Sequence, residues 1–255
     1  MPSNAPSFLR THGKPSNVGH RGAMGTRPEN TLAAFEEAAR LGADWVELDV
    51  RLSKDGVPMV LHDATLERTT TGRGPVSRAS ARTLAKLDAG AWFGKAYRGE
   101  PVPRLDAVLA WARERGVGVE IELKGDPVCA PGLAEAVVKA VKDTSTTDRV
   151  LAISFDHAVC KHLKSIAKSL RTGLLYAARP ADPVAFAKLA KADVLVPHAS
   201  FVCPEDVARA HGAGLGVATW APSDPKVLAA LVSAGVDAIT VDHPDVLAKV
   251  LRAAK

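Results

Sequence analysis

The feature that most constrains the fold of this chain is a regular alternation of short apolar runs with longer amphipathic segments. Eight of the apolar runs have the length of buried β-strands and lead into polar residues. These runs are 18–20, 45–50, 117–123, 150–154, 172–176, 194–197, 215–219 and 238–241. The segments between them carry apolar residues on one helical face, as Leu105, Val108 and Leu109 do. Such alternation is typical of an α/β protein with a parallel sheet.

Eight strand–helix units in a chain of 255 residues predict a (β/α)8 TIM barrel. The structural alternative is an open, doubly wound sheet. No Gly-x-Gly-x-x-Gly loop follows the first run, and this absence disfavours a dinucleotide-binding protein of that type. We therefore expect the barrel.

A ninth apolar run, 57–61, follows the second predicted strand after only the short turn Ser53-Lys54-Asp55-Gly56. A short Asp-Gly turn makes an antiparallel hairpin, because parallel neighbours need a crossover of a dozen or more residues. We expect residues 53–103 to form this hairpin and a small insertion in the loop after the second strand. The chain 1–255 is then a single TIM-barrel domain, and the stretch 1–16 is either a flexible arm or a contact segment.

The charge balance narrows the range of partners. The chain has 33 Lys and Arg against 28 Asp and Glu, which leaves a net charge of +5. The basic residues are scattered among acidic ones and form no stripe, so we expect no nucleic-acid partner. No apolar run approaches the roughly 20 residues that cross a bilayer, and we expect no membrane anchor and no export signal.

The cysteines indicate a reducing environment. Cys129, Cys160 and Cys203 are widely spaced, odd in number and fit no zinc-binding pattern. We expect them to be free thiols in a cytoplasmic protein. The number of subunits is left open.

Charged side chains gather where the predicted strands end, which is the edge at which TIM barrels hold their active sites. Glu47 and Asp49 are two residues apart on one strand, so their side chains point to the same face. The set is His20 and Arg21 at the end of the first strand, Glu47 and Asp49 on the second, His62 and Asp63 after the hairpin, Glu120, Glu122 and Lys124 on the third, Asp156 at the end of the fourth, and Asp242 and His243 at the end of the last.

Three carboxylates in this set predict a metal site. Glu47, Asp49 and Glu122, buried together, would repel one another and have raised pKa values unless a cation joined them. Oxygen ligands alone favour a hard ion, so we expect one divalent cation, Mg²⁺ or Ca²⁺, rather than zinc. The alternative is that Glu47 and Asp49 are interior residues paired with Lys124 and Arg51. Barrel interiors are usually filled by Val, Ile and Leu, which favours the metal.

Two histidines lie beside these carboxylates. His20 and His62 could act as general base and general acid, because imidazole exchanges protons near neutral pH. A single histidine at a strand end is more often a hydrogen-bonded structural residue, and this alternative stays open for either one taken alone. His198 and His243 also follow predicted strands and are minor candidates.

Arg21 and Lys124 add fixed positive charge at the same edge. Together with a divalent cation they suit an anionic, phosphate-bearing substrate. A hard metal, two cations and two imidazoles together predict phosphoryl transfer.

In order along the chain, these residues resemble the motifs of the glycerophosphodiester phosphodiesterases, and the resemblance covers nearly the whole sequence. The matching segments are His20-Arg21-Gly22, Pro28-Glu29-Asn30-Thr31, Glu47-Leu48-Asp49-Val50, His62-Asp63 with Leu66, Arg68-Thr69-Thr70 and Gly74, then Leu87-Asp88-Ala89-Gly90-Ala91-Trp92-Phe93, Val102-Pro103 and Glu122-Leu123-Lys124.

The resemblance implies a TIM barrel with a small inserted subdomain that hydrolyses glycerophosphodiesters to an alcohol and glycerol 3-phosphate. It also implies a role for each matching residue. His20 and His62 would be the acid–base pair, Glu47, Asp49 and Glu122 the ligands of Mg²⁺ or Ca²⁺, and Arg21 and Lys124 the phosphate contacts.

Secondary candidates and departures concern specificity. Glu29, Phe155 and Trp220 are secondary site residues, and Asn30 is predicted to be the N-cap of a helix over 31–41. The family usually has Trp-Thr-Val-Asn near the seventh strand, whereas this chain has Ala218-Thr219-Trp220-Ala221, so an aromatic and an amide are expected to be moved or lost. Arg104 stands where the family more often has Thr.

Three other functions stay open. The same site could cleave lysophospholipids in the manner of a lysophospholipase D, although few aromatic residues and no amphipathic insertion support an apolar substrate surface. It could also be a lyase that closes a cyclic phosphate. A protein of another class, one that binds phosphate esters without catalysis, would need the cations but not two histidines beside three carboxylates.

Overall fold

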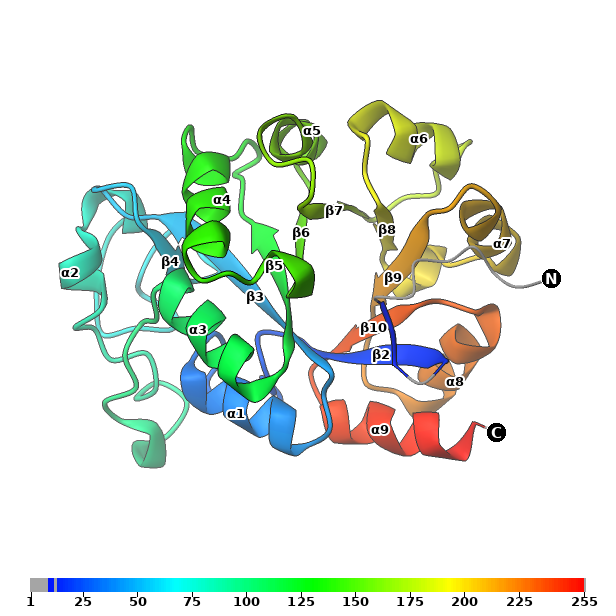
Figure 1. Cartoon of the computed structure of the whole chain (residues 1–255). Helices are drawn as coiled ribbons and strands as arrows, with labels where there is room; N and C mark the ends of the chain where they lie inside the picture. Colours follow the sequence, from blue (N-terminus) through cyan, green and yellow to red (C-terminus); the bar gives the residue numbers. More distant parts are fainter. Residues whose placement is uncertain (1–8, 12, 255) are drawn as a thin grey trace.

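The structure, a computed structural model, describes residues 9–11 and 13–254. In these residues eight parallel strands pair in the order β2, β10, β9, β8, β7, β6, β5, β3, and β3 pairs with β2 to close the barrel (Figure 1). The predicted (β/α)8 barrel is therefore confirmed, and the open sheet is wrong. The barrel strands are β2 (Lys14–Gly19), β3 (Trp45–Leu52), β5 (Gly118–Leu123), β6 (Val150–Ser154), β7 (Arg171–Tyr176), β8 (Val194–Pro197), β9 (Gly216–Trp220) and β10 (Ala238–Val241).

A helix follows each barrel strand and covers the outside of the barrel. The helices are α1 (Leu32–Arg40), α3 (Leu105–Arg115), α4 (Leu133–Asp143), α5 (His157–Ile166), α6 (Pro183–Ala190), α7 (Pro204–Gly212), α8 (Pro225–Ala234) and α9 (Pro244–Ala253). Several begin where a side chain caps the first amides: Asp156, Asp182 and Asp224 do so for α5, α6 and α8. Among the described helices, none combines the length and apolar character needed to cross a bilayer.

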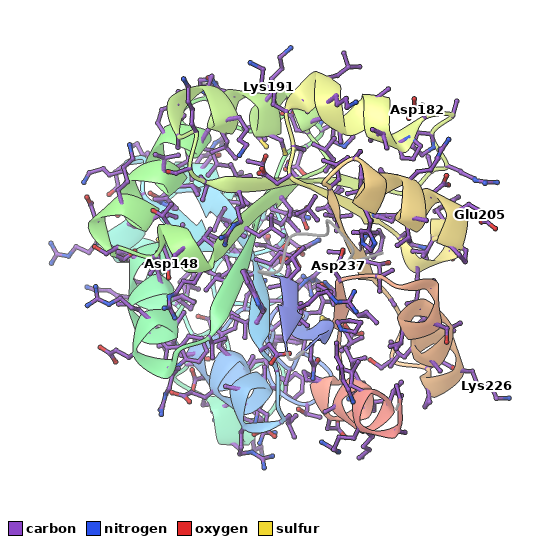
Figure 2. The ribbon with its side chains drawn as sticks, turned by 45° about the vertical axis from the view of Figure 1, so that its right-hand side comes forward. Asp148, Asp182, Lys191, Glu205, Lys226 and Asp237 are labelled. Carbon is purple, nitrogen blue, oxygen red and sulfur yellow. The ribbon has the colours of Figure 1, made fainter. Side chains whose placement is uncertain are left out.

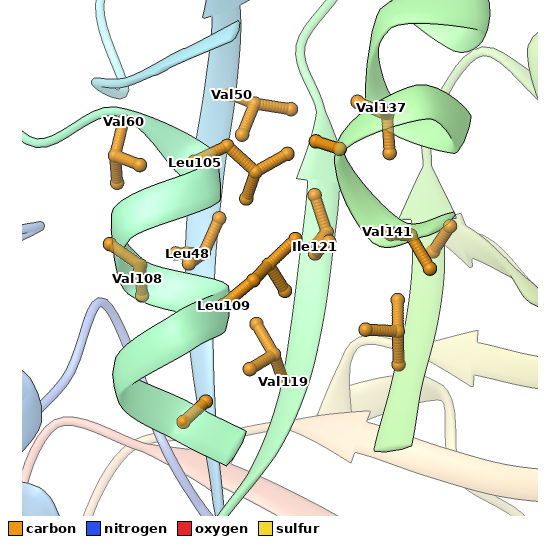
Figure 3. Packing of buried hydrophobic residues seen from close by; sticks show 14 of the residues in the cluster. Leu48, Val50, Val60, Leu105, Val108, Leu109, Val119, Ile121, Val137 and Val141 are labelled. Carbon is orange, nitrogen blue, oxygen red and sulfur yellow. The ribbon is translucent and has the colours of Figure 1, made fainter. Parts of the chain in front are cut away.

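Most of the apolar core lies between the strands and the outer helices. Figure 3 shows Leu48 and Ile121, from neighbouring strands, facing Leu105 and Leu109 of α3. All four side chains are fully buried. Because side chains alternate along a strand, Leu48 and Ile121 pack outward while the acidic residues beside them in sequence point into the barrel.

The end of the barrel opposite the carboxyl edge is closed by packed side chains. Leu9 and Trp45 belong to an interior cluster with Val18 and Ala238. Gly118 makes room for the indole of Trp45, because a Cβ at this position would lie 2.2 Å from the ring.

Hydrogen bonds to a buried carboxylate also stabilise this end of the barrel, opposite the carboxyl edge. Asp237, which is fully buried, accepts hydrogen bonds from Arg10 Nη1 at 3.1 Å and from the backbone N–H of Val217 at 2.8 Å. Figure 2 shows Asp237 near the barrel and Lys191 and Lys226 on the outer ring of helices.

The first barrel strand begins four residues earlier than predicted. Lys14–Ser16 pair in β2, and Arg10–Thr11 form a short strand, β1, antiparallel to it, where we had allowed for a flexible arm over 1–16. The apolar pattern missed these residues because Asn17 is polar yet buried, and its side chain donates hydrogen bonds to the carbonyls of Gly42 and Pro244. The rest of that stretch, 1–8 and 12, lies outside the described residues.

The segment between β3 and α3 holds one further strand and three short helices. Strand β4 (Pro58–Val60) pairs antiparallel with β3, as the Asp-Gly turn indicated. The short helices η2 (Val76–Arg78), α2 (Ala81–Leu84) and η3 (Lys95–Tyr97) follow. Met59, Leu66 and Leu84 belong to a separate small core beneath them. This core gives the insertion a fixed shape against the barrel.

Candidate active site

Three acidic side chains meet inside the carboxyl end of the barrel. Glu47 and Asp49 extend from β3, and Glu122 extends from β5, where Asp49 and Glu122 are partners in the strand register. One carboxylate oxygen of each lies within 4.8 Å of the others. Glu47 is 3% exposed and Asp49 is 1% exposed. The structure therefore brings together the three residues that the sequence predicted as metal ligands.

The pKa values of these acids reflect their crowding. Burial, followed by the charges of Asp49 and Glu122, raises the pKa of Glu47 well above its usual value. Burial and Asp49 likewise raise the pKa of Glu122. Burial would also raise the pKa of Asp49, but Arg21 and Lys124 outweigh it and keep that pKa low. Two of the three acids thus resist ionisation unless a further positive charge joins them.

A divalent cation fits this set of donors. Asp49 Oδ1 is buried and accepts no hydrogen bond from any described residue. Lys124 Nζ lies 3.5 Å from this oxygen and pairs with it by charge, without a hydrogen bond. A buried acceptor without a hydrogen bond is costly, and a metal ion would satisfy it. Three carboxylates and no sulfur or imidazole ligand favour Mg²⁺ or Ca²⁺.

Asn30 holds Asp49 in place. Its Nδ2 donates to Asp49 Oδ2 at 2.8 Å, and its Oδ1 accepts from the Asp49 backbone N–H at 3.2 Å. The prediction that Asn30 is the N-cap of the first helix is wrong, because the hydroxyl of Thr31 accepts the hydrogen bond from Ala34 N–H. Asn30 instead has a positive φ of 59°, a conformation that asparagine tolerates better than most residues.

Each of the two histidines is held by a carboxylate. His20 Nδ1 lies 2.7 Å from Asp242 Oδ1, and His62 Nδ1 lies 2.7 Å from Asp63 Oδ1. His20 Nε2 is 3.9 Å from Glu47 Oε2. Burial lowers the pKa of His62, and the nearby carboxylates only partly oppose this. In both rings the Nδ1 contact leaves Nε2 as the nitrogen that can exchange a proton.

The two predicted cations contact the acidic cluster. Arg21 Nε lies 3.2 Å from Asp49 Oδ2, and Lys124 Nζ lies 2.7 Å from Glu122 Oε1 and 3.5 Å from Asp49 Oδ1. The alternative pairing that we considered is therefore present for Lys124. It is wrong for Arg51, which binds Asp126 and donates to the backbone carbonyl of His62 at 2.7 Å.

A chain of ion pairs connects the insertion to this cluster. Glu29 accepts from Arg21 Nη1 at 2.8 Å and from Arg68 Nη1 at 2.7 Å, and its side chain is 4% exposed. Arg68 Nε also binds Asp63, the carboxylate that holds His62, at 2.7 Å. Glu29, a secondary candidate, thus binds two arginines and lies outside the group of three acids.

A cavity of about 210 Å³ opens at the carboxyl edge of the barrel and has one polar and one apolar side. Asp49 and Glu29 are not among the described residues that line it. Phe155 and Trp220, both secondary candidates, lie on the apolar side with their rings 6.2 Å apart and nearly perpendicular. The aromatic of this segment is therefore not lost from the cavity, since Trp220 supplies one at the end of β9. The lining residues are His20, Arg21, Glu47, His62, Glu120, Glu122, Lys124, Ile153, Phe155, Leu175, Val196, Trp220 and Thr240.

The minor candidates lie behind this lining. The ring centroid of His198 is 4.4 Å from that of Trp220, and His198 Nδ1 accepts from Ser200 N–H. The ring of His243 lies against Gly25, where a Cβ would be 2.3 Å away. Neither histidine is among the described residues that line the cavity.

Several residues of the site were given no role from the sequence, for identifiable reasons. Asp242 directly follows a predicted strand, and its position there was a usable signal. Arg68 lies in an irregular segment with no periodicity to indicate its direction. Glu120 shares a strand face with Glu122, so alternation places it inside the barrel but does not indicate a role for it.

Comparison with known proteins identifies the family of the chain. The family model described as the glycerophosphoryl diester phosphodiesterase family matches residues 20–246. A glycerophosphodiester phosphodiesterase of Caldanaerobacter subterraneus subsp. tengcongensis is 37% identical over 235 residues, which is 92% of this chain and 97% of that protein.

Solved structures show the same fold. The crystal structure of a glycerophosphodiester phosphodiesterase from Agrobacterium tumefaciens is 36% identical, with a TM-score of 0.81 over 91% of this chain and 98% of that one. An Oleispira antarctica phosphodiesterase in complex with the product sn-glycerol-3-phosphate is 31% identical, with a TM-score of 0.86 over 94% of this chain and 97% of that one.

Proposed function

Because the chain belongs to the glycerophosphoryl diester phosphodiesterase family and is a glycerophosphodiester phosphodiesterase, we propose that it uses a divalent cation and a histidine pair to release glycerol 3-phosphate. The observation that carries the proposal is that both histidines line one cavity with Glu47 and Glu122, and that Asp49 belongs to the same group of carboxylates. The other product is the alcohol.

The proposed role of each residue follows from the charge of its side chain and from its position in the cavity. Glu47, Asp49 and Glu122 would hold the cation, which when bound polarises the phosphate oxygens as a Lewis acid. Arg21 and Lys124 place two fixed positive charges beside the same oxygens. These charges stabilise the negative charge that builds up on phosphorus oxygens in the transition state.

Proton transfer is assigned to the two imidazoles. One Nε2 accepts the proton of the attacking hydroxyl group or water, and the other donates a proton to the leaving alcohol oxygen. Asp242 and Asp63 each accept from Nδ1–H, which fixes the tautomer and stabilises the imidazolium form. No proton is gained or lost over the two transfers together.

We expect His20→Ala and His62→Ala each to lower kcat by about 10²–10⁴ while the far-UV circular dichroism stays unchanged. His162→Ala is the matched control, because His162 is an exposed residue of α5 paired with Glu135. Near-normal rates in both active-site variants would refute the acid–base assignment.

Metal dependence separates this enzyme from a phosphate-ester binding protein. EDTA should abolish product formation, and added Mg²⁺ or Ca²⁺ should restore it. A binding protein would form no product under any of these conditions. Phosphorus NMR of the early products distinguishes direct hydrolysis from closure of a cyclic phosphate.

One observation favours lysophospholipids as a second substrate class. Phe155 is 50% exposed on the apolar side of the cavity, where an acyl chain could lie. Rates with lysophosphatidylethanolamine and glycerophosphoethanolamine, measured side by side, test this alternative.

We also propose a reducing location, the cytoplasm, for the enzyme. Cys129, Cys160 and Cys203 are free thiols, and burial raises the pKa of Cys129 to about 11 and that of Cys160 to about 12. Thiols of this kind are inert when reduced.

A further inference from the structure

The roles proposed above leave one acidic residue of the cavity unexplained. Glu120 lies on β5 two residues before Glu122, so it points into the barrel on the same face. It is 3% exposed and lines the cavity. Thr240 Oγ1, on β10, donates to Glu120 Oε2 at 3.0 Å.

The hydrogen bond between Glu120 and Thr240 crosses the barrel interior. In the strand order, β10 and β5 are separated by β2 and β3, so the two side chains reach toward each other from different walls. Two residues of a strand span about 6.6 Å along the strand, and barrel strands are tilted, so Glu120 lies deeper than Glu122 by somewhat less than this. Its register partner on β3 is Glu47, so the two form the inner layer of acidic side chains in the barrel, and Asp49 and Glu122 form the outer one.

Packing does not account for a carboxyl group at this depth. Its neighbours in the lining include the apolar residues Ile153, Leu175 and Val196. Among the described residues no Lys, Arg or His forms an ion pair with Glu120, and Thr240 supplies its one side-chain hydrogen bond. A Val, Ile or Leu would fill such a position at lower cost.

We propose that Glu120 is a specificity-determining residue that accepts a hydrogen bond from a hydroxyl group of the substrate's glycerol. The inference rests on the proposed function, since the phosphate position comes from the predicted metal and cation contacts. Glycerol carries hydroxyl groups on a three-carbon chain, and this chain can extend from the phosphate toward the depth of Glu120. Its C–H surface would face the apolar residues opposite.

The glycerol end, rather than the alcohol end, suits the inner part of the cavity. Glycerol is common to every glycerophosphodiester, whereas the alcohol varies. The inner end is closed by Glu120 and Thr240, while the half-exposed Phe155 borders the solvent side. A fixed group fits the closed end, and a variable group fits the open one.

Binding of two product-like ligands tests the proposal without depending on turnover. Isothermal titration with Mg²⁺ present would compare glycerol 3-phosphate with propyl phosphate, which has the same three carbons but neither free hydroxyl group. Glu120→Leu should weaken glycerol 3-phosphate binding about 10- to 100-fold and leave propyl phosphate binding unchanged within about threefold. Glu120→Gln, which preserves the shape, should give an intermediate loss because a neutral acceptor binds more weakly.

The matched control is Ile153→Val, which alters the same cavity without removing an acceptor. It should change the two affinities together and leave their ratio unchanged. The proposal is overturned if either Glu120 variant keeps the wild-type ratio, or if both affinities fall equally, as a structural role would require. The wild-type protein could fail to hydrolyse glycerophosphodiesters while the Glu120 variants still change the ratio of the two affinities as expected. That result would contradict the proposed function but not the role of Glu120.

Discussion

Each imidazole at the site depends on a carboxylate that does not itself face the substrate. Asp242 lies 2.7 Å from His20 Nδ1, and the hydrogen bond to His20 lowers the pKa of Asp242. A carboxylate that stays ionised can stabilise the imidazolium form, whereas a neutral amide cannot. The residue therefore acts through His20 as a positioning residue.

Asp242→Asn should lower kcat by about 10²–10⁴ and change KM little, because the substrate contacts remain. Steady-state kinetics measure the separation between kcat and KM. Asp245→Asn is the control: Asp245 lies three residues further along and pairs with Lys249 at the surface. An equal loss in both variants would contradict the role of Asp242.

A second prediction at the residue scale concerns Asn30. Asn30→Ala removes both hydrogen bonds to Asp49, so the carboxylate is no longer held for the cation. We expect the concentration of Mg²⁺ needed for half-maximal activity to rise about 10- to 100-fold, with kcat at saturating metal much less affected. An unchanged metal requirement in a folded variant would show that Asn30 serves the loop alone.

At the scale of elements, Arg68 connects the insertion to the barrel through ion pairs. Its guanidinium joins Glu29, from the loop after β2, to Asp63, which follows β4. The hydrogen bond from Arg68 is the largest factor that lowers the pKa of Asp63. For Glu29, burial alone would raise the pKa, but the bonds from Arg68 and Arg21 outweigh it.

Arg68→Met should lower both kcat and the melting temperature at pH 7. Arg68 is half exposed, so its ion pairs are screened, and we expect a loss of only about 1 kcal/mol, or about 2–4 °C. Because the folded-state pKa values of Glu29 and Asp63 are depressed, their stabilisation is complete above the usual carboxyl pKa and is lost as pH falls through the lower folded values. The difference in melting temperature between Arg68→Met and the wild type should therefore shrink below about pH 4.

The control is Arg73→Met, an exposed change in the same insertion, which should leave the melting temperature unchanged. A difference for Arg68→Met that stays constant down to pH 3 would contradict this account.

The strands of the site were predictable where their side chains alternate. In Glu47-Leu48-Asp49, for example, the alternation of acidic and apolar residues predicts from the sequence alone which side chains point into the barrel. The start of β2 was missed because Ser16 and Asn17 are polar yet buried. Asn30 and Arg68 lie in irregular segments, so their contacts depend on how the folded loops meet and leave no periodic trace in the sequence.

At the scale of the whole molecule, the proposed metal site predicts that the stability of the fold depends on a divalent cation. The three carboxylates repel one another, and a cation bound only by the folded state shifts unfolding to higher temperature. At 100 times the dissociation constant the gain is about 2.7 kcal/mol, or about 5–11 °C for a protein of this size.

Differential scanning calorimetry with EDTA and with Mg²⁺ or Ca²⁺ measures this gain. Glu122→Gln serves as the comparison, because it relieves repulsion and removes a ligand. We expect this variant to be as stable as the wild type or more stable in EDTA, and to gain much less from metal. If the wild-type melting temperature is the same in EDTA and with divalent cations, these carboxylates do not hold a resident metal.

The packed interior below the cavity has a kinetic consequence. Leu9 and Trp45 fill the far end of the barrel, so reactant and products must all pass the same mouth at the carboxyl edge. If glycerol lies innermost, as proposed, the alcohol would depart first and glycerol 3-phosphate second. The second product would then occupy the place that the next reactant needs, and its accumulation would slow the enzyme by direct competition.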